Sequence, residues 1–255
     1  MSAKLSLCLA AMLATQTALF AQGRGRGGTA PPPPTAKAAA PIDVTGYWVS
    51  VVTEDWRYRM VTPAHGDYQG VPMTPAARAI ADAWDPAKEE VSGDLCKSYG
   101  APALLRVPGR LHITWQDDQT LRMDSDAGKQ TRMFHFGLST SAGQAKAPAG
   151  AHTIQGDSAA EWQGGGRGAT DGTLQVTTSN LKAGFLRKNG VPYSENASLN
   201  EYYELITQPN GTPLLVVTIV TTDPVYLRQP FVVSSQFKKE PNEAKWNPTA
   251  CSATW

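Results

Sequence analysis

Residues 104–136 restrict the fold of this chain more than any other segment. Three short runs there alternate apolar and polar side chains, and turn-prone Asp or Gly residues separate them. In the first run Leu111, Ile113 and Trp115 share one face, while His112 belongs to the other face. An alternation of period two does not suit a helix, so this series predicts antiparallel hairpins.

Four more runs of strand type follow along the chain. They cover residues 173–180, 199–206, 213–222 and 231–240. Helix is scarce: only residues 74–85 have a helical pattern, with Thr74 as a cap, Pro75 in the first turn and Asp85-Pro86 as the stop. Residues 137–170 are expected to be loops. We therefore expect an all-β, antiparallel domain with one short helix, either a closed barrel or a β-sandwich.

The first strand pattern runs from residue 43 to residue 60. Its second half, EDWRYRM, would place Trp56, Tyr58 and Met60 on one face and the two arginines on the other. This is typical of a half-buried strand. The alternative is that these aromatic side chains form a stacking wall for an aromatic ligand.

The N-terminus has the composition of an export signal. Residues 1–21 combine one early lysine, an apolar run and Ala21 as a cleavage residue, and an uncleaved N-terminal anchor is the alternative. Residues 22–41 are rich in Gly, Pro and Ala, which predicts a disordered linker. The single folded domain would then be residues 42–255, exported to the periplasm or the extracellular space.

Charge and cysteine content limit the partners. Without Lys4 in the leader, 22 basic residues balance 22 acidic ones, so nucleic acid is not an expected partner, and no membrane span is expected after cleavage. Cys96 and Cys251 are the two cysteines outside the leader, and an even pair in an exported protein predicts a disulfide, with free thiols as the alternative. The sequence gives no prediction of the oligomeric state.

Three short motifs resemble the lipocalin or calycin pattern. They are Gly46-x-Trp48 at the first strand, TTDPVY at residues 221–226 and FKK at residues 237–239. The resemblance implies a calycin-like barrel in which Trp48 plugs one end and Lys238 or Lys239 covers its ring. A ligand would then enter from the opposite end.

Several longer segments resemble a set of exported bacterial β-rich proteins for which no activity is established. The segments are ADAWDP, RVPGRLHITWQDDQTLRMDSDAG, KAGFLRKNGVPYSENA, DPVYLRQPFVVSSQFKKE and WNPTAC. This resemblance implies export and β architecture, and it transfers no catalytic residues.

The histidines of the hairpin series are the first candidates for chemistry. If His112 and His135 faced a cavity, they could move a proton, or bind a metal together with Asp124. Polar strand residues usually face solvent, and no tight metal-binding spacing occurs, so no metal site is predicted. Signatures of nucleotide, haem and hydrolase sites are absent from the sequence, and no cofactor is predicted.

A second candidate is the polar segment at residues 185–197. Arg187 could hold a carboxylate or phenolic ligand at a barrel mouth, with Tyr193 and Ser194 beside it. The further predicted ligand-binding residues are His112, His135 and Trp115. The alternative is a β-connection in which Asn189-Gly190 serves only the turn.

A third candidate is the strand run NEYYEL. Glu201 and Tyr203 share a face, and inside a barrel this carboxyl would be a buried acid suited to proton transfer. Together with His112 they are the predicted catalytic candidates. The alternative is an ion pair of Glu201 across the sheet with Arg106, Arg122 or Arg132.

These patterns lead to three functional hypotheses. The first is a binding protein for a small apolar or aromatic molecule. The second is a cofactor-independent lyase, isomerase or cyclase, which requires Glu201, Tyr203, His112 and Arg187 to converge on one cavity. The third is a structural or interaction domain of the cell envelope, which a filled barrel interior would favour.

Overall fold

The computed structural model describes residues 33–137, 151–164 and 171–254. The expected signal peptide and the first part of the expected linker lie outside these residues. The described residues from Pro34 onward belong to one compact unit.

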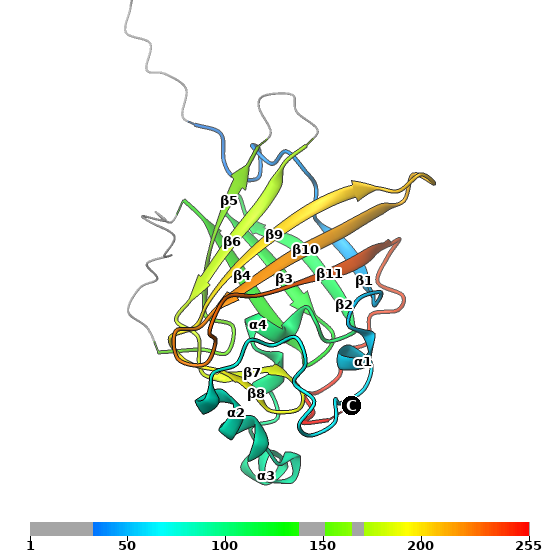
Figure 1. The fold of residues 1–255 in the computed structure, drawn as a ribbon. Helices are drawn as coiled ribbons and strands as arrows, with labels where there is room; N and C mark the ends of the chain where they lie inside the picture. Colours follow the sequence, from blue (N-terminus) through cyan, green and yellow to red (C-terminus); the bar gives the residue numbers. More distant parts are fainter. Residues whose placement is uncertain (1–32, 138–150, 165–170, 255) are drawn as a thin grey trace, which may run out of the picture. The chain divides into compact units, whose positions relative to one another are not determined.

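A closed β-barrel forms most of this unit (Figure 1). Its nine strands within the described ranges are β1 (Gly46–Val51), β2 (Arg110–Asp117), β3 (Thr120–Ser125), β4 (Gln130–Phe136), β5 (Asp157–Gln163), β6 (Thr173–Ser179), β9 (Ser198–Thr207), β10 (Pro213–Thr222) and β11 (Phe231–Glu240). The order around the barrel is β1-β11-β10-β9-β6-β5-β4-β3-β2, and β1 closes the ring by pairing with both β11 and β2. The predicted all-β barrel is confirmed, and the sandwich alternative is wrong.

One neighbouring pair in the barrel is parallel. An odd number of strands cannot alternate in direction around a closed ring, so at least one pair must run parallel. Here this pair is β4 and β5, which align Phe134–Phe136 with Ser158–Ala160. The barrel therefore differs from the eight-stranded antiparallel barrel of lipocalins.

Short elements form a cap over one end of the barrel (Figure 1). They are α1 (Trp56–Arg59), α2 (Pro75–Asp82), α3 (Pro86–Ser92), the 3₁₀ turn η1 (Lys97–Tyr99), α4 (Ala101–Leu104) and the hairpin β7 (Gly184–Arg187) and β8 (Val191–Tyr193). The helix expected over residues 74–85 is confirmed as α2, and the Thr74 hydroxyl accepts from the Ala77 amide at 3.2 Å. The other helices were not predicted because each spans at most two turns.

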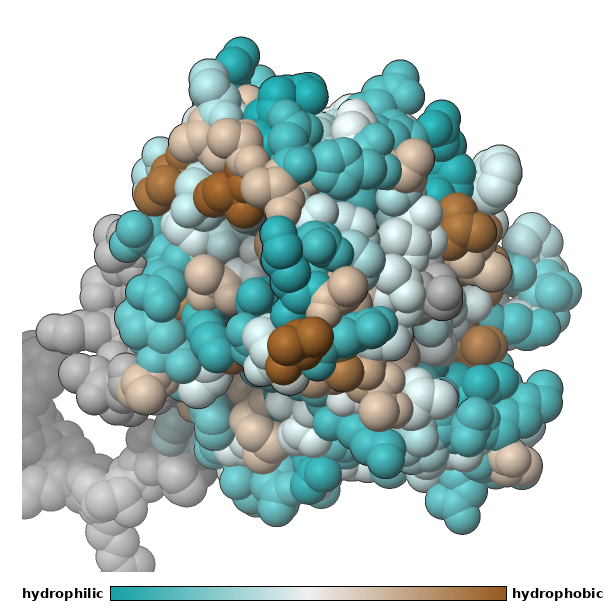
Figure 2. All heavy atoms as spheres, turned by 90° about the horizontal axis from the view of Figure 1, so that it is seen from below, coloured by the Kyte–Doolittle hydropathy of each residue, from teal (hydrophilic) through white to brown (hydrophobic). Residues whose placement is uncertain are grey.

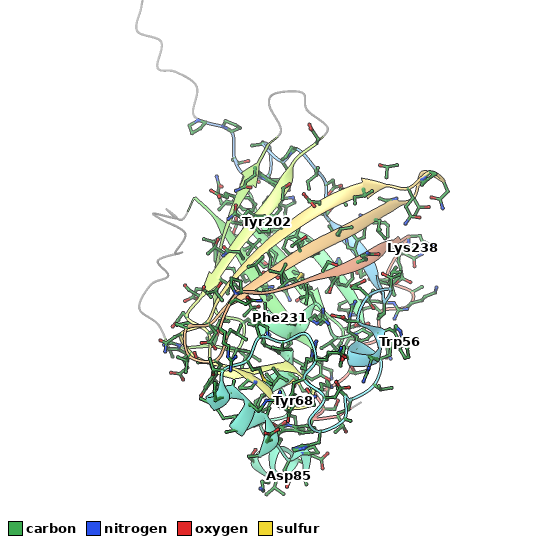
Figure 3. The ribbon with its side chains drawn as sticks, viewed as in Figure 1. Trp56, Tyr68, Asp85, Tyr202, Phe231 and Lys238 are labelled. Atoms are coloured by element: carbon green, nitrogen blue, oxygen red, sulfur yellow. A yellow bond between two sulfur atoms is a disulfide. The ribbon has the colours of Figure 1, made fainter. Side chains whose placement is uncertain are left out.

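The expected strand over residues 43–60 is wrong in its second half. The strand ends at Val51, Asp55 adopts a left-handed conformation with φ 51°, and α1 follows. This turn changes the expected faces: Trp56 is 63% exposed and points away from the barrel (Figure 3). Arg59 is buried, whereas Arg57 is exposed as expected. The buried guanidinium of Arg59 donates to Glu54 at 2.6 Å and to the Arg106 carbonyl at 3.0 Å.

Two segments expected to be irregular are ordered on the barrel. Residues 157–163, which fell in an expected loop, form β5. Residues 34–41 of the expected linker lie against the barrel, where the indole of Trp162 donates to the Ala36 carbonyl at 2.8 Å and the Lys37 amide donates to the Asp118 carbonyl at 3.1 Å. A linker prediction from composition misses such contacts because they depend on a strand far along the chain.

The barrel interior is filled by its own side chains. Trp48, Met123, Phe134, Tyr203 and Phe237 are among the large residues with almost no exposed area, and they belong to one continuous apolar core. Burying a side chain of this size contributes about 1.5–3 kcal/mol. The face alternation predicted for β2 and β9 is confirmed by this core.

The first strand shows why the chain carries Gly-x-Trp. The indole of Trp48 donates to the Val44 carbonyl at 2.9 Å, and the Lys239 ammonium lies 4.4 Å from the Trp48 ring centre. Gly46 has φ 101°, and a Cβ there would lie 2.9 Å from the Lys239 nitrogen, which donates to the Thr45 carbonyl. The predicted cation over Trp48 is thus Lys239, and Lys238 instead points outward (Figure 3).

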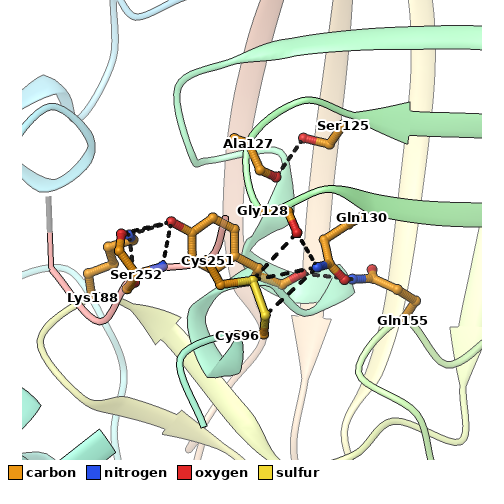
Figure 4. Close-up of a disulfide and its surroundings, with 10 residues drawn as sticks. Cys96, Ser125, Ala127, Gly128, Gln130, Gln155, Lys188, Cys251 and Ser252 are labelled. Atoms are coloured by element: carbon orange, nitrogen blue, oxygen red, sulfur yellow. Dashed lines mark hydrogen bonds between the residues drawn. A yellow bond between two sulfur atoms is a disulfide. The ribbon is translucent and has the colours of Figure 1, made fainter. Parts of the chain in front are cut away.

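A disulfide joins the cap to the C-terminal segment (Figure 4). It links Cys96 and Cys251 as predicted, over a sequence separation of 155 residues. The same region is held by Lys188, whose ammonium donates to the Tyr99 hydroxyl at 2.7 Å and the Ser252 carbonyl at 2.9 Å. The tail is thus fixed to the cap by one covalent and several polar contacts.

The surface of the cap end is mostly hydrophilic, with small separate apolar patches (Figure 2). Within the described ranges no helix combines the length and the apolar character needed to cross a membrane.

Candidate functional site

A pocket of about 420 Å³ lies where the barrel meets the cap. We call it the junction pocket, and its lining residues are Asp55, Arg57, Tyr58, Gln69, Gly70, Arg187, Phe231, Val232 and Val233. They come from α1, from the loop before α2, from the end of β7 and from the start of β11. The pocket therefore exists only because four distant segments meet.

Arg187 is the buried charged group of the junction pocket. It is 5% exposed, its Nη1 donates to the Gln69 carbonyl at 2.8 Å, and its guanidinium carbon lies 4.0 Å from the centre of the Tyr58 ring. The Phe231 ring is 5.8 Å away on the barrel side. Burial, together with the nearby charge of Arg106, lowers the pKa of Arg187 to about 10, so the group remains a cation at neutral pH.

Tyr58 presents an aromatic face and a hydroxyl in the same pocket. Its hydroxyl lies 3.3 Å from both the Asp67 carboxylate and the Gln69 side-chain carbonyl. Arg57 forms an ion pair with Asp67. The guanidinium carbon of Arg57 is 5.0 Å from the Tyr58 ring centre. The ring is therefore fixed by cation–π contacts and by a polar anchor at its tip.

The junction pocket has an excess of positive charge. Arg57 and Arg187 are the cations of its lining, and Asp55 is the carboxylate. Asp55 is also engaged by Arg106, whose Nη2 donates to it at 2.9 Å. An aromatic wall with an uncompensated guanidinium suits a flat molecule with one negative charge.

The other polar residues predicted beside Arg187 are buried in the cap. Ser194 donates its hydroxyl to Asp223 at 2.8 Å and its amide to the same carboxylate at 2.6 Å. Tyr193 is 1% exposed, and burial raises the pKa of its phenol. Asn189 donates its side-chain amide to two cap carbonyls, so this turn has a packing role as well as a geometric one. Neither Tyr193 nor Ser194 lines the junction pocket.

The histidines lie outside the barrel. His112 stacks on Tyr47 with ring centres 4.0 Å apart, and Trp246 packs against both edges. His135 is exposed and borders a groove of about 330 Å³ beside the parallel strand pair. Among the described residues, no group of three or more His, Cys, Asp or Glu side chains is arranged to hold a metal ion.

Trp115 belongs to an aromatic cluster away from the junction pocket. Its ring centre lies 5.6 Å from that of Phe136 and 6.5 Å from that of Trp162. The Ala36 carbonyl, which accepts from Trp162, ties the N-terminal segment to this cluster. Trp115 therefore packs in this cluster and does not line the junction pocket, and its ligand-binding role stays a prediction.

Glu201 and Tyr203 do lie together inside the barrel. Both Nη atoms of Arg132 donate to the Glu201 carboxylate, at 2.8 and 2.6 Å, and the Tyr203 hydroxyl donates to it at 3.2 Å. Arg132 also donates to Thr178 at 3.0 Å. The ion-pair alternative is therefore the one observed, with Arg132 as the partner.

The convergence required for the enzyme hypothesis does not occur. Glu201 and Tyr203 face the barrel interior, His112 lies on the outer surface, and Arg187 lies in the cap. Strand alternation predicts which side chains share a face of the strand. It does not predict which of these faces points into the closed barrel, or which residues lie near the cap.

A larger space of about 600 Å³ lies near Ile42, Thr173 and Leu205. Among the described residues, its lining contains the carboxylates Asp171 and Glu204 and no cation. The part of this lining that the structure describes has neither a cation nor an aromatic side chain, whereas the junction pocket has both.

Sequence reasoning identified two residues of the junction pocket separately. Arg187 was a ligand candidate and Tyr58 belonged to the possible stacking wall, but their contact was not foreseen. Gln69 and Phe231 were missed, because neither has a local sequence signal for binding. Only the tertiary structure brings these residues together.

Comparison with family models, with curated proteins and with solved structures found no match for this chain. The resemblances to lipocalins and to exported β-rich proteins therefore stay predictions. The class supported by the fold and the site is a closed nine-stranded barrel with a capped end and a cationic, aromatic pocket at the junction.

Proposed function

We propose that this protein binds a small aromatic molecule with one negative charge, such as an aromatic carboxylate, in the junction pocket. The observation that carries the proposal is the buried Arg187 stacked on Tyr58 at the wall of a pocket of about 420 Å³. Pockets for small ligands usually have volumes of about 300–1,000 Å³, with apolar walls and a few placed polar groups.

The packed barrel core also supports this location. A ligand inside the barrel would have to displace fully buried side chains such as Phe134 and Tyr203. A ligand in the junction pocket needs no such displacement. The binding site is thus beside the barrel mouth, and not within the barrel as in the binding mode expected from the lipocalin resemblance.

The test is a calorimetric titration with three matched probes. Benzoate combines a ring with a charge, benzamide keeps the ring without the charge, and acetate keeps the charge without the ring. We expect saturable binding of benzoate and at least tenfold weaker binding of the other two, because both parts of the pocket contribute. Equal binding of benzoate and benzamide, or no saturable heat with benzoate and its ring-substituted analogues, would overturn the proposal.

Two variants locate the site. Arg187→Met removes the cation with little change in volume, and Arg122→Met removes a half-exposed arginine paired with Asp124 on the outside of the barrel. We expect Arg187→Met to lose benzoate binding and Arg122→Met to retain it. Tyr58→Leu should also weaken binding, and it gives a second variant in case Arg187→Met does not fold.

We further propose that the protein is exported, with residues 1–21 removed. The disulfide supports this location, since such bonds persist in oxidising compartments. N-terminal sequencing of the protein from the native host's extracytoplasmic fraction should begin at Gln22. Recovery of the chain only from the cytoplasm, with Met1 intact, would contradict export.

A structural role in the cell envelope is the second candidate, and the filled barrel interior favours it. The same titrations separate the two proposals. Saturable, Arg187-dependent benzoate binding supports the binding function, and its absence supports the structural role.

A further inference from the structure

We propose that the cap holds a buried monatomic anion of chloride size between Arg106 and Arg187. Both arginines line a small cavity of about 20 Å³, and Tyr58 and Arg187 border both this cavity and the junction pocket. Its lining includes Ser98, Arg106, Arg187, Lys188 and Tyr58. This site is distinct from the proposed ligand pocket and does not depend on it.

Both arginines have a donor without a protein acceptor. Arg106 is 4% exposed and Arg187 is 5% exposed, yet Nη1 of Arg106 and Nε of Arg187 have no hydrogen-bond partner among the described residues. Their other contacts are specific, since Arg106 donates to Asp55 and Arg187 donates to the Gln69 carbonyl. A buried N–H of a charged group without an acceptor costs on the order of 1–3 kcal/mol or more. Two such groups at one cavity therefore favour an acceptor inside it.

The charge around the cavity favours an anion as that acceptor. Arg106, Arg187 and Lys188 line the cavity, and among the described residues no carboxylate lines it. Asp55 reaches Arg106 from outside the lining, and the proximity of Arg106 contributes to the lowered pKa of Arg187. A negative ion between the two guanidinium groups would oppose their repulsion.

The volume of the cavity fits a monatomic ion and is too small for a polyatomic anion. A volume of about 20 Å³ exceeds the roughly 10–15 Å³ that one water molecule needs. Chloride is only slightly larger than water, whereas a carboxylate or a phosphate has several heavy atoms and does not fit. Ser98 also lines the cavity, and a serine hydroxyl can donate a hydrogen bond to an anion.

The first test measures thermal unfolding at constant ionic strength while chloride replaces gluconate, which is too large for the cavity. An ion that binds only the folded state raises Tm with its concentration. We expect Tm of the wild type to rise with the logarithm of the chloride concentration, and bromide to act in the same way. In Arg106→Met this dependence should be lost, and in Arg122→Met it should match the wild type. Equal chloride dependence of all three proteins would overturn the proposal.

The second test requires no variant. Crystals of the wild-type protein grown in sodium bromide should give an anomalous bromine peak between Arg106 and Arg187. Ordered density there without an anomalous signal would identify water only and would contradict the proposal. The benzoate titrations test the proposed function, and the bromide crystals test the anion site. Failure of one proposal can therefore be distinguished from failure of the other.

Discussion

Single buried polar residues in this protein are held by partners that are distant in sequence. Asp223 shows this most clearly, since its carboxylate accepts from the Ser194 hydroxyl and amide and from the Val225 amide. This one residue ties β8 in the cap to the loop between the last two barrel strands. Asp223 lies in the TTDPVY motif, so the motif marks a junction between barrel and cap.

Glu89 gives the clearest pH dependence at the residue scale. It is buried in α3, where its carboxylate accepts from the Trp84 indole at 3.1 Å, and burial raises its pKa above the ordinary value of 4.5. Between 4.5 and the raised value the folded state binds more protons than the unfolded state. The contribution of Glu89 to the free energy of unfolding is therefore fully present below pH 4.5. It is lost as pH rises through the raised pKa.

We predict that Glu89→Gln removes this pH dependence while keeping an acceptor for Trp84. From pH 4 to pH 7 the variant should become more stable relative to wild type, so the difference in the free energy of unfolding (variant minus wild type) should increase. Urea unfolding at several pH values checks this, with the exposed neighbour Glu90→Gln as the control. Parallel curves for Glu89→Gln and wild type would show that Glu89 does not titrate differently in the folded state.

The predictability of the elements depended on their length and regularity. The runs at residues 213–222 and 231–240 match β10 and β11 because each has ten residues with a strong pattern. The strand prediction for the segment EDWRYRM is wrong, since four helical residues after a left-handed Asp55 also alternate aromatic and basic side chains. Short segments carry too few periods to separate a helix from a strand.

The candidate site was less predictable than the strands. Arg187 and Tyr58 are 129 positions apart, and nothing near either residue indicates the other. Their contact depends on the cap, whose short helices and hairpin were mostly not foreseen. Local patterns predict the face of a strand, while the site depends on long-range packing.

At the scale of elements, the Arg132–Glu201 pair joins β4 to β9 across the barrel interior. We predict that Glu201→Gln lowers the free energy of unfolding by about 3–5 kcal/mol, because it leaves a buried guanidinium without a counter-charge. The exposed Glu204→Gln on the same strand should change it by less than about 0.5 kcal/mol. Chemical denaturation measures both.

An apolar double replacement provides a further check on this pair. Arg132→Met with Glu201→Leu should recover most of the stability that Glu201→Gln loses, since it removes both charges together. A double variant as unstable as the single one would mean that packing, and not the charge left behind, causes the loss.

At the scale of the whole unit, the disulfide restrains a loop of 155 residues that includes most of the barrel. We predict that Cys96→Ser with Cys251→Ser lowers stability by about 2–5 kcal/mol, because the unfolded chain gains the entropy of an open loop. Calorimetric unfolding with and without a reducing agent tests this. The reductant should lower Tm of the wild type and leave Tm of the double variant unchanged; a wild type insensitive to full reduction would contradict the prediction.

The central claim is that the junction pocket, and not the barrel interior, is the binding site. An NMR titration of the ¹⁵N-labelled protein with benzoate tests it most directly. We predict saturable shifts of the backbone amides of Tyr58, Gln69, Gly70 and Phe231, with little change at Glu204–Ile206 beside the larger acidic space. Shifts centred on Glu204–Ile206 or on the core strands, or no saturable shifts at all, would contradict the claim.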